Sequence, residues 1–112
     1  MEERIPRKSV EVSDNFKAHL TEAYDYTFDT FGYVQAERYI QKIEKAIDSL
    51  YNSYLLYPEC RYLATKSRIY RNIILDTHLI IYRITQERIE VLDIVHGASS
   101  IGKIRSIRKI RL

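Results

Sequence analysis

The spacing of apolar residues in the first half of the chain predicts two helices. Over 16–28, large apolar residues recur at every fourth position, which places them in one stripe along a helix. Ser13 or Asp14 supplies the side-chain oxygen that caps the start of a helix, and Gly32 is a typical C-terminal stop. A second run with spacings of three and four follows over 34–54. Because the break is so short, we expect an antiparallel helical hairpin.

β-branched and aromatic residues dominate the second half and predict three strands. The strands are expected at 70–75, 78–85 and 89–96, separated by turns of only a few residues. Turns this short join antiparallel neighbours, since a parallel crossover needs a dozen residues or more. The apolar runs 73–75 and 79–81 are nearly continuous, which predicts that the first two of these strands are central in the sheet.

Two short segments complete the expected architecture. Residues 8–12 alternate weakly and predict an N-terminal strand, and isoleucines spaced three apart among basic residues over 101–111 fit a short amphipathic helix or turn. The order β-α-α-β-β-β with a basic C-terminal helix or tail predicts an α+β fold of two layers, with the helical hairpin on one side of a mostly antiparallel sheet. A chain of 112 residues is expected to form a single domain, 1–112.

Composition narrows the class of protein. Hydrophobic residues make up 46% and charged residues 29% of the chain, which is typical of a folded domain. Cys60 is the one cysteine, so a disulfide within the chain and a zinc site of several cysteines are excluded. Residues 1–6 lack the apolar stretch of a secretory signal, and no run reaches the roughly 18 apolar residues of a membrane span. We therefore expect a cytoplasmic protein without a membrane partner.

Charge is distributed unevenly along the chain. Residues 1–56 carry 7 basic and 10 acidic side chains, a net charge of −3, whereas residues 57–112 carry 11 basic and 5 acidic, a net charge of +6. No acid follows Asp93 in the sequence, but five cations do: Lys103, Arg105, Arg108, Lys109 and Arg111. This pattern predicts an anionic partner on one face, and its alternative is a solvated cationic tail.

The sequence lacks the common signatures of catalytic and metal sites. Its three glycines do not form a phosphate-binding loop, and His19, His78 and His96 lie in different predicted elements without the spacing of metal ligands. We therefore expect neither a metal nor another cofactor. Cys60 has no neighbour that marks an activated thiol, so we expect a buried or half-buried free cysteine.

Two runs in the second half carry the pattern of a known family. In the run 70–84 an arginine opens one strand and a Tyr-Arg-hydrophobic triplet closes the next, and the run 89–97 ends in His-Gly. A strand and two helices precede them, with Pro58-Glu59 after the second helix. Together these features resemble the RelE/ParE-type toxins of bacterial type II toxin–antitoxin systems, over nearly the whole chain.

The resemblance implies a growth-inhibiting toxin that a cognate antitoxin holds inactive, of the kind linked to plasmid stabilization. It leaves two targets open. One is mRNA on the ribosome, cleaved by a metal-independent mRNA interferase, and the other is DNA gyrase, bound by an inhibitor with no reaction of its own. A degenerate, non-toxic binding module is a third alternative, and a homodimer is left open. Many family members place Arg-Asp after His-Gly, where this chain has Ala-Ser-Ser at 98–100, and this departure favours the gyrase inhibitor.

The chemistry of RNA cleavage selects candidate catalytic residues. Without a metal, the ribose 2′-OH attacks, and the reaction needs a base, an acid and positive charge beside the phosphate. Arg71 is the candidate for the phosphate, and His96 for proton transfer. Their structural alternatives are pairing of Arg71 with an acid across the sheet and capping of a strand end by His96. Candidate residues for binding RNA, the ribosome or another target are Arg83, Lys103, Arg105 and Arg108.

Three further residues have both a structural and a functional interpretation. Arg83 lies in the middle of its strand, a position that favours a structural role. Tyr70 and Tyr82 are candidates for stacking on a base. In a chain with ten tyrosines, however, most of them are expected to pack in the core and at its rim.

Overall fold

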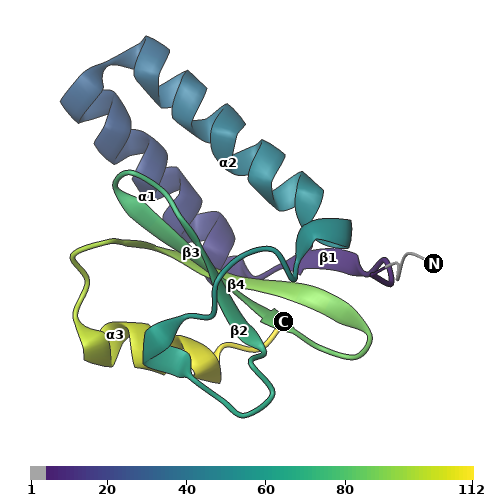
Figure 1. The fold of residues 1–112 in the computed structure, drawn as a ribbon. Helices are drawn as coiled ribbons and strands as arrows, with labels where there is room; N and C mark the ends of the chain where they lie inside the picture. The colour runs from purple at the N-terminus through teal and green to yellow at the C-terminus, as the bar shows by residue number, and fades with distance from the viewer. Residues whose placement is uncertain (1–4) are drawn as a thin grey trace.

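The computed structural model describes residues 5–112, so part of the N-terminal segment considered for a secretory signal lies outside the described residues. The predicted order of a strand, two helices, three strands and a short C-terminal helix is confirmed (Figure 1). The elements are β1 (Ser9–Val12), α1 (Asp14–Phe31), α2 (Tyr33–Ser53), the 3₁₀ turn η1 (Arg61–Leu63), β2 (Tyr70–Ile74), β3 (His78–Ile84), β4 (Arg88–His96), α3 (Ile101–Ser106) and the 3₁₀ turn η2 (Ile107–Lys109).

The four strands form one mixed sheet in the order β1-β4-β3-β2. The pairs β2–β3 and β3–β4 are antiparallel, as predicted, and β1 runs parallel to β4. The prediction that β2 is central is wrong, because β2 forms the edge and its Ile74 is 67% exposed. The run is apolar because Ile73 packs beneath the helices, which does not require a central strand. The outer edge of β2 pairs instead with the segment that precedes it, where Asn72 N–H donates to Pro58 O at 3.0 Å.

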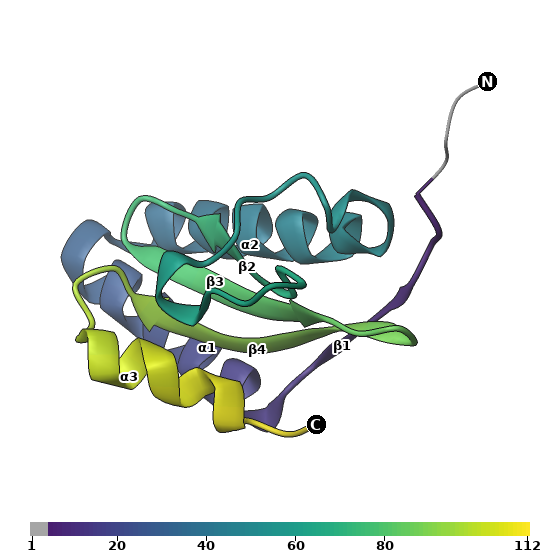
Figure 2. The same cartoon turned by 60° about the horizontal axis from the view of Figure 1, so that its bottom comes forward.

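The helical hairpin lies on one side of the sheet, as predicted, and the short C-terminal helix, whose side was not predicted, lies on the other. The hairpin of α1 and α2 covers one face, and α3 lies with η1 on the other (Figure 1, Figure 2). The central strands are apolar on both faces, so the second face also needs a cover. Ile81, Leu92 and Val95 point to that face and pack with Ile104 and Ile107 of the C-terminal segment.

Local signals set the ends of the two long helices as the sequence predicts. Ser13 caps α1, since its Oγ accepts a hydrogen bond from Phe16 N–H at 2.9 Å and donates one to Leu92 O, which ties the helix start to β4. Gly32 ends α1 with φ +89°, a conformation that favours glycine, and its N–H donates to Phe28 O at 2.8 Å. α2 begins at the next residue, which makes the hairpin tight.

The buried stripe of α2 is the predicted one. Ile43 and Leu50 are fully buried against the sheet, and Ile47 is partly buried beside them. The opposite face of α2 carries exposed charged residues such as Lys42 and Lys45. Among residues 5–112, every helix is too short or too polar to pass through a bilayer.

Candidate histidine cluster and basic face

Arg71 is anchored to main-chain oxygens near the end of α2. Its guanidinium donates to Tyr57 O at 2.9 Å, Arg68 O at 3.1 Å and Leu55 O at 3.3 Å. The structural alternative for Arg71 was an acidic partner, but carbonyl groups fill that role. Arg71 therefore links the segment after α2 to the edge strand, and its guanidinium already donates three hydrogen bonds to main-chain carbonyl groups.

The two candidate catalytic residues do not meet. Arg71 lies opposite Tyr82 on β3, and His96 lies opposite His78 on the same strand. Positions 78 and 82 are four residues apart, which corresponds to about 13 Å along a strand. Because the Arg71 guanidinium is also bound to the carbonyl groups of Leu55, Tyr57 and Arg68, it is not directed toward His96.

His96 instead belongs to a cluster of aromatic side chains where β3 begins and β4 ends. The rings of His78 and His96 lie with their centroids 5.6 Å apart, and Tyr26 of α1 stands edge-on to both, at 6.0 and 5.6 Å. Tyr39 of α2 forms a hydrogen bond of 2.8 Å between its hydroxyl and Nδ1 of His78. Burial, and to a lesser degree His96, lowers the pKa of His78 and favours its neutral form.

His96 also caps its strand end, which was its structural alternative. Ala98 N–H donates to Nδ1 of His96 at 3.1 Å, so the neutral ring carries its proton on Nε2. Nearby, Nδ1 of His19 lies 2.6 Å from Oδ1 of Asp93. His19 and His96 border a hollow of about 190 Å³. It is lined by His19, Glu22, Ala23, Tyr26, His78, Ile94, Val95, His96 and Lys103.

No motif or spacing in the sequence points directly to this cluster. The three histidines come from α1, β3 and β4, and their spacing along the chain does not indicate that they lie near one another. Within residues 5–112, no group of three or more His, Cys, Asp or Glu side chains is arranged to hold a metal ion. Cys60 is buried as expected, and burial raises the pKa of its thiol, so it is a weak nucleophile.

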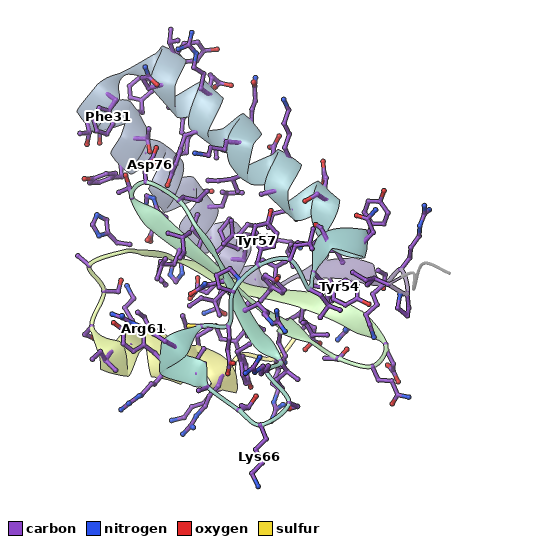
Figure 3. All side chains as sticks on the ribbon, in the orientation of Figure 1. Phe31, Tyr54, Tyr57, Arg61, Lys66 and Asp76 are labelled. Atoms are coloured by element: carbon purple, nitrogen blue, oxygen red, sulfur yellow. The ribbon has the colours of Figure 1, made fainter. Side chains whose placement is uncertain are left out.

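A second candidate region is the surface around α3, which we call the basic face. It consists of six exposed cations: Arg61, Lys103, Arg105, Arg108, Lys109 and Arg111. Arg61 comes from η1, which packs against α3 (Figure 3). None of the four ion pairs found among residues 5–112 includes any of these cations. The predicted binding residues Lys103, Arg105 and Arg108 are thus all exposed around α3, and Lys103 also borders the hollow beside the histidines.

Arg83, the remaining predicted binding residue, lies beneath this surface. It is 8% exposed, and its guanidinium pairs with Glu90 at 2.7 Å. It also donates to Arg108 O at 3.3 Å and Ile110 O at 3.2 Å. Burial opposes the charged form of Glu90, but hydrogen bonds from Arg83 and Arg88 outweigh it and hold the pKa of Glu90 below its usual value. Arg83 therefore positions the C-terminal segment from inside.

Of the two tyrosines considered for base stacking, Tyr82 is ruled out. It is fully buried, and its hydroxyl donates to Tyr54 O at 2.6 Å. Burial raises the pKa of its hydroxyl. Tyr70 is half-buried, and the guanidinium of Arg83 lies 5.9 Å from its ring centroid. Both residues therefore pack in or beside the core.

Comparison with known proteins gives consistent matches. The model of a family described as "ParE toxin of type II toxin-antitoxin system, parDE" matches residues 10–101. Two curated relatives named Toxin ParE1, from two strains of Mycobacterium tuberculosis, are each 32% identical over 88 residues, which cover 78% of this chain and 87% of the relative. A chain of the chromosomal ParDE system from P. aeruginosa has a similar fold, with a TM-score of 0.65 and 18% identity, over 82% of this chain and 98% of that one.

Proposed function

This chain belongs to the ParE toxin family of type II toxin–antitoxin systems, and we propose that it arrests growth by binding DNA gyrase in the cytoplasm rather than by cleaving RNA. Toxins of this family are paired with a cognate antitoxin, which makes the chain one half of such a pair. The observation that carries the choice of mechanism is the separation of Arg71 from His96 along β3.

RNA cleavage without a metal needs its charged and proton-transferring groups around one phosphate. A general acid or base acts within hydrogen-bond reach of the proton that it moves. Arg71 lies about 13 Å along β3 from the position of His96, and its guanidinium is anchored to three carbonyl groups. An inhibitor that acts by contact has no such requirement, and the basic face offers an exposed surface for it.

One observation favours mRNA cleavage as a second candidate function. His96 and Lys103 border the same hollow, which brings a proton-transfer group and a cation together without Arg71. His19 borders it as well. In this alternative, Nε2 of His96 would exchange a proton with the RNA, and Lys103 would supply positive charge beside the phosphate.

We also propose that the antitoxin neutralises the toxin by covering the basic face with an acidic segment. The support is the charge of the second half of the chain, with 11 basic and 5 acidic residues, and the clustering of six of its cations around α3. Attraction of this kind accelerates association and weakens as salt is added. The bound acidic segment would block contact with gyrase by occupying the same surface.

Expression of the chain without its antitoxin tests the mechanism. We expect DNA replication to stop before translation, while mRNA 5′ ends remain those of uninduced cells. His96→Ala should arrest growth as wild type does, because the proposed mechanism moves no proton. New mRNA 5′ ends that disappear with His96→Ala would instead establish the second candidate.

A further inference from the structure

The basic face is a fixed surface rather than a solvated tail. Ile104 and Ile107 are 1% and 2% exposed and pack into the second face of the sheet. Arg83 holds the end of the segment through the carbonyl oxygens of Arg108 and Ile110. The cations are therefore presented on a packed backbone, and a ligand would not have to order this segment when it binds.

Acids border this surface without forming ion pairs to its cations: Glu22 lines the same hollow as Lys103, and Glu59 lines the same hollow as Arg61. No acid follows Asp93 in the sequence, and the ion pairs among residues 5–112 leave out all six cations. Glu90 lies beneath the surface, but Arg83 and Arg88 already bind it. Like charges along one short segment repel one another, and an anionic ligand relieves that repulsion. The ligand must therefore carry several negative charges at close spacing.

We propose that the basic face binds the backbone phosphates of double-stranded DNA. In the context of the proposed function, on which this extension rests, the toxin would recognise gyrase together with the DNA that gyrase holds. The contact with DNA itself needs no gyrase, so it can be measured separately.

The dimensions of the basic face fit a duplex. From Lys103 to Lys109 the chain advances roughly 10 Å, given a rise of about 1.5 Å per residue in α-helix and 2.0 Å in 3₁₀-helix. The extended residues Ile110 and Arg111 add at most roughly 6 Å. One strand of a duplex carries a phosphate about every 3.4 Å, so this length faces about four phosphates. The segment supplies five cations over that length, and Arg61 adds a sixth from η1 beside it.

The distribution of apolar residues favours a ligand bound through its charges, such as a phosphate backbone, over a folded partner held by an apolar contact. The large apolar side chains exposed along this segment, Ile101 and Leu112, lie at its two ends, 48% and 42% exposed. Between them the exposed side chains are those of Lys, Arg and Ser106. A protein interface normally has a buried apolar centre, whereas the phosphate backbone requires positive charge and hydrogen-bond donors. Contacts to phosphates carry no sequence information, so the binding should not depend on base sequence.

Fluorescence anisotropy with a labelled duplex of about 20 base pairs tests this proposal directly. With four to six phosphate contacts, raising salt from 50 to 200 mM should weaken binding roughly 10²–10³-fold. The double variant Arg105→Glu/Arg108→Glu should bind at least tenfold more weakly than wild type and show a shallower salt dependence. Lys42→Glu/Lys45→Glu is the matched control, because it reverses two exposed charges on α2, across the sheet. We expect the control to bind within about threefold of wild type, and thermal melting confirms that each variant is folded.

Several results would overturn the proposal. They are the absence of duplex binding at 50 mM salt, equal losses in the two double variants, and binding at least tenfold tighter to single-stranded RNA of the same length. A supercoiling assay with gyrase separates this failure from failure of the proposed function. If gyrase is inhibited through the basic face but duplex is not bound, the face contacts an acidic protein surface. If duplex is bound through the face but gyrase is unaffected, the DNA contact stands and the gyrase target is wrong.

Discussion

His78 and His96 lie directly opposite each other on β3 and β4, and a one-residue irregularity in the strand pairing brings them together. Tyr82 pairs with Val91, but Ile81 pairs with Asp93, so one extra residue of β4 is accommodated between these pairs. Without it, continuation of the register would place His78 opposite Val95. The bulge thus places His96 opposite His78 and beside Tyr26, within the histidine cluster.

The helical hairpin should contribute stability rather than contacts with a target. Ile43 is fully buried between α2 and the sheet, so Ile43→Ala should lower the free energy of unfolding by about 2–5 kcal/mol. Ile74→Ala is the control, because Ile74 is 67% exposed on the edge strand and should change stability by less than about 0.5 kcal/mol. Urea denaturation measures both variants, and equal losses would show that the α2 stripe is not the core.

Arg83→Met should destabilise the fold by leaving Glu90 with only part of its pairing. Both side chains are nearly buried, and removal of one partner of such a pair costs on the order of 3 kcal/mol. The double variant Arg83→Met/Glu90→Leu should recover much of this loss, since no buried charge remains. Hydrogen exchange over 104–110 provides the second measurement, because loss of the bonds to Arg108 O and Ile110 O should raise exchange there. Unchanged exchange in this segment would refute a positioning role for Arg83.

Stability should fall as pH is lowered through the range in which histidine titrates. Burial lowers the pKa of His78, so the unfolded chain, with a histidine pKa near 6.5, binds a proton more readily than the native state. The contribution of His78 is fully present above pH 6.5 and is lost as pH falls toward its lowered native pKa. The pKa of Glu90 is also lowered, which adds a separate loss below about pH 4.5.

Melting temperatures measured between pH 7.5 and 5 test this expectation. His78→Gln should flatten the slope in that window. The separate loss below about pH 4.5, followed by continuing the series to lower pH, should remain. A slope that is unchanged in His78→Gln would assign the pH dependence to other groups.

Association with the antitoxin should depend on ionic strength. Stopped-flow measurements at 50 and 300 mM salt should show a slower association rate at high salt, because the Debye length falls to well under 10 Å above 0.15 M. Arg105→Glu/Arg108→Glu should associate more slowly than Lys42→Glu/Lys45→Glu at low salt. Rates that do not change with salt would remove the electrostatic part of the proposal for the antitoxin.

Most of the fold could be predicted because its signals are local. Spacings of three and four, the cap at Ser13 and the stop at Gly32 define α1 and α2, and β-branched runs with short turns define the last three strands. The order of strands across the sheet depends on contacts between distant segments. The apolar sequence of 73–75 does not show whether the outer edge of β2 pairs with another strand or, as here, with the segment around Pro58. The family resemblance, which rested on order and spacing over the whole chain, is confirmed.

The candidate site was harder to predict because it depends on the register of strand pairs. If the pairing of β3 and β4 is continued from the turn after Thr85 without a bulge, His78 faces Val95. The bulge in β4 shifts the register by one residue, so that His78 faces His96. Nothing in the residues alone locates that bulge. The role of Arg83 was anticipated from its position in the middle of a strand, but its carbonyl partners at 108 and 110 follow from how the C-terminal segment folds back.

The most direct test of the central claim is a supercoiling assay with purified gyrase, relaxed plasmid and this toxin. The account predicts that wild type and His96→Ala inhibit supercoiling equally, while Arg105→Glu/Arg108→Glu loses at least tenfold in potency and Lys42→Glu/Lys45→Glu does not. Full gyrase activity in the presence of excess wild-type toxin that still arrests growth in cells would contradict the account.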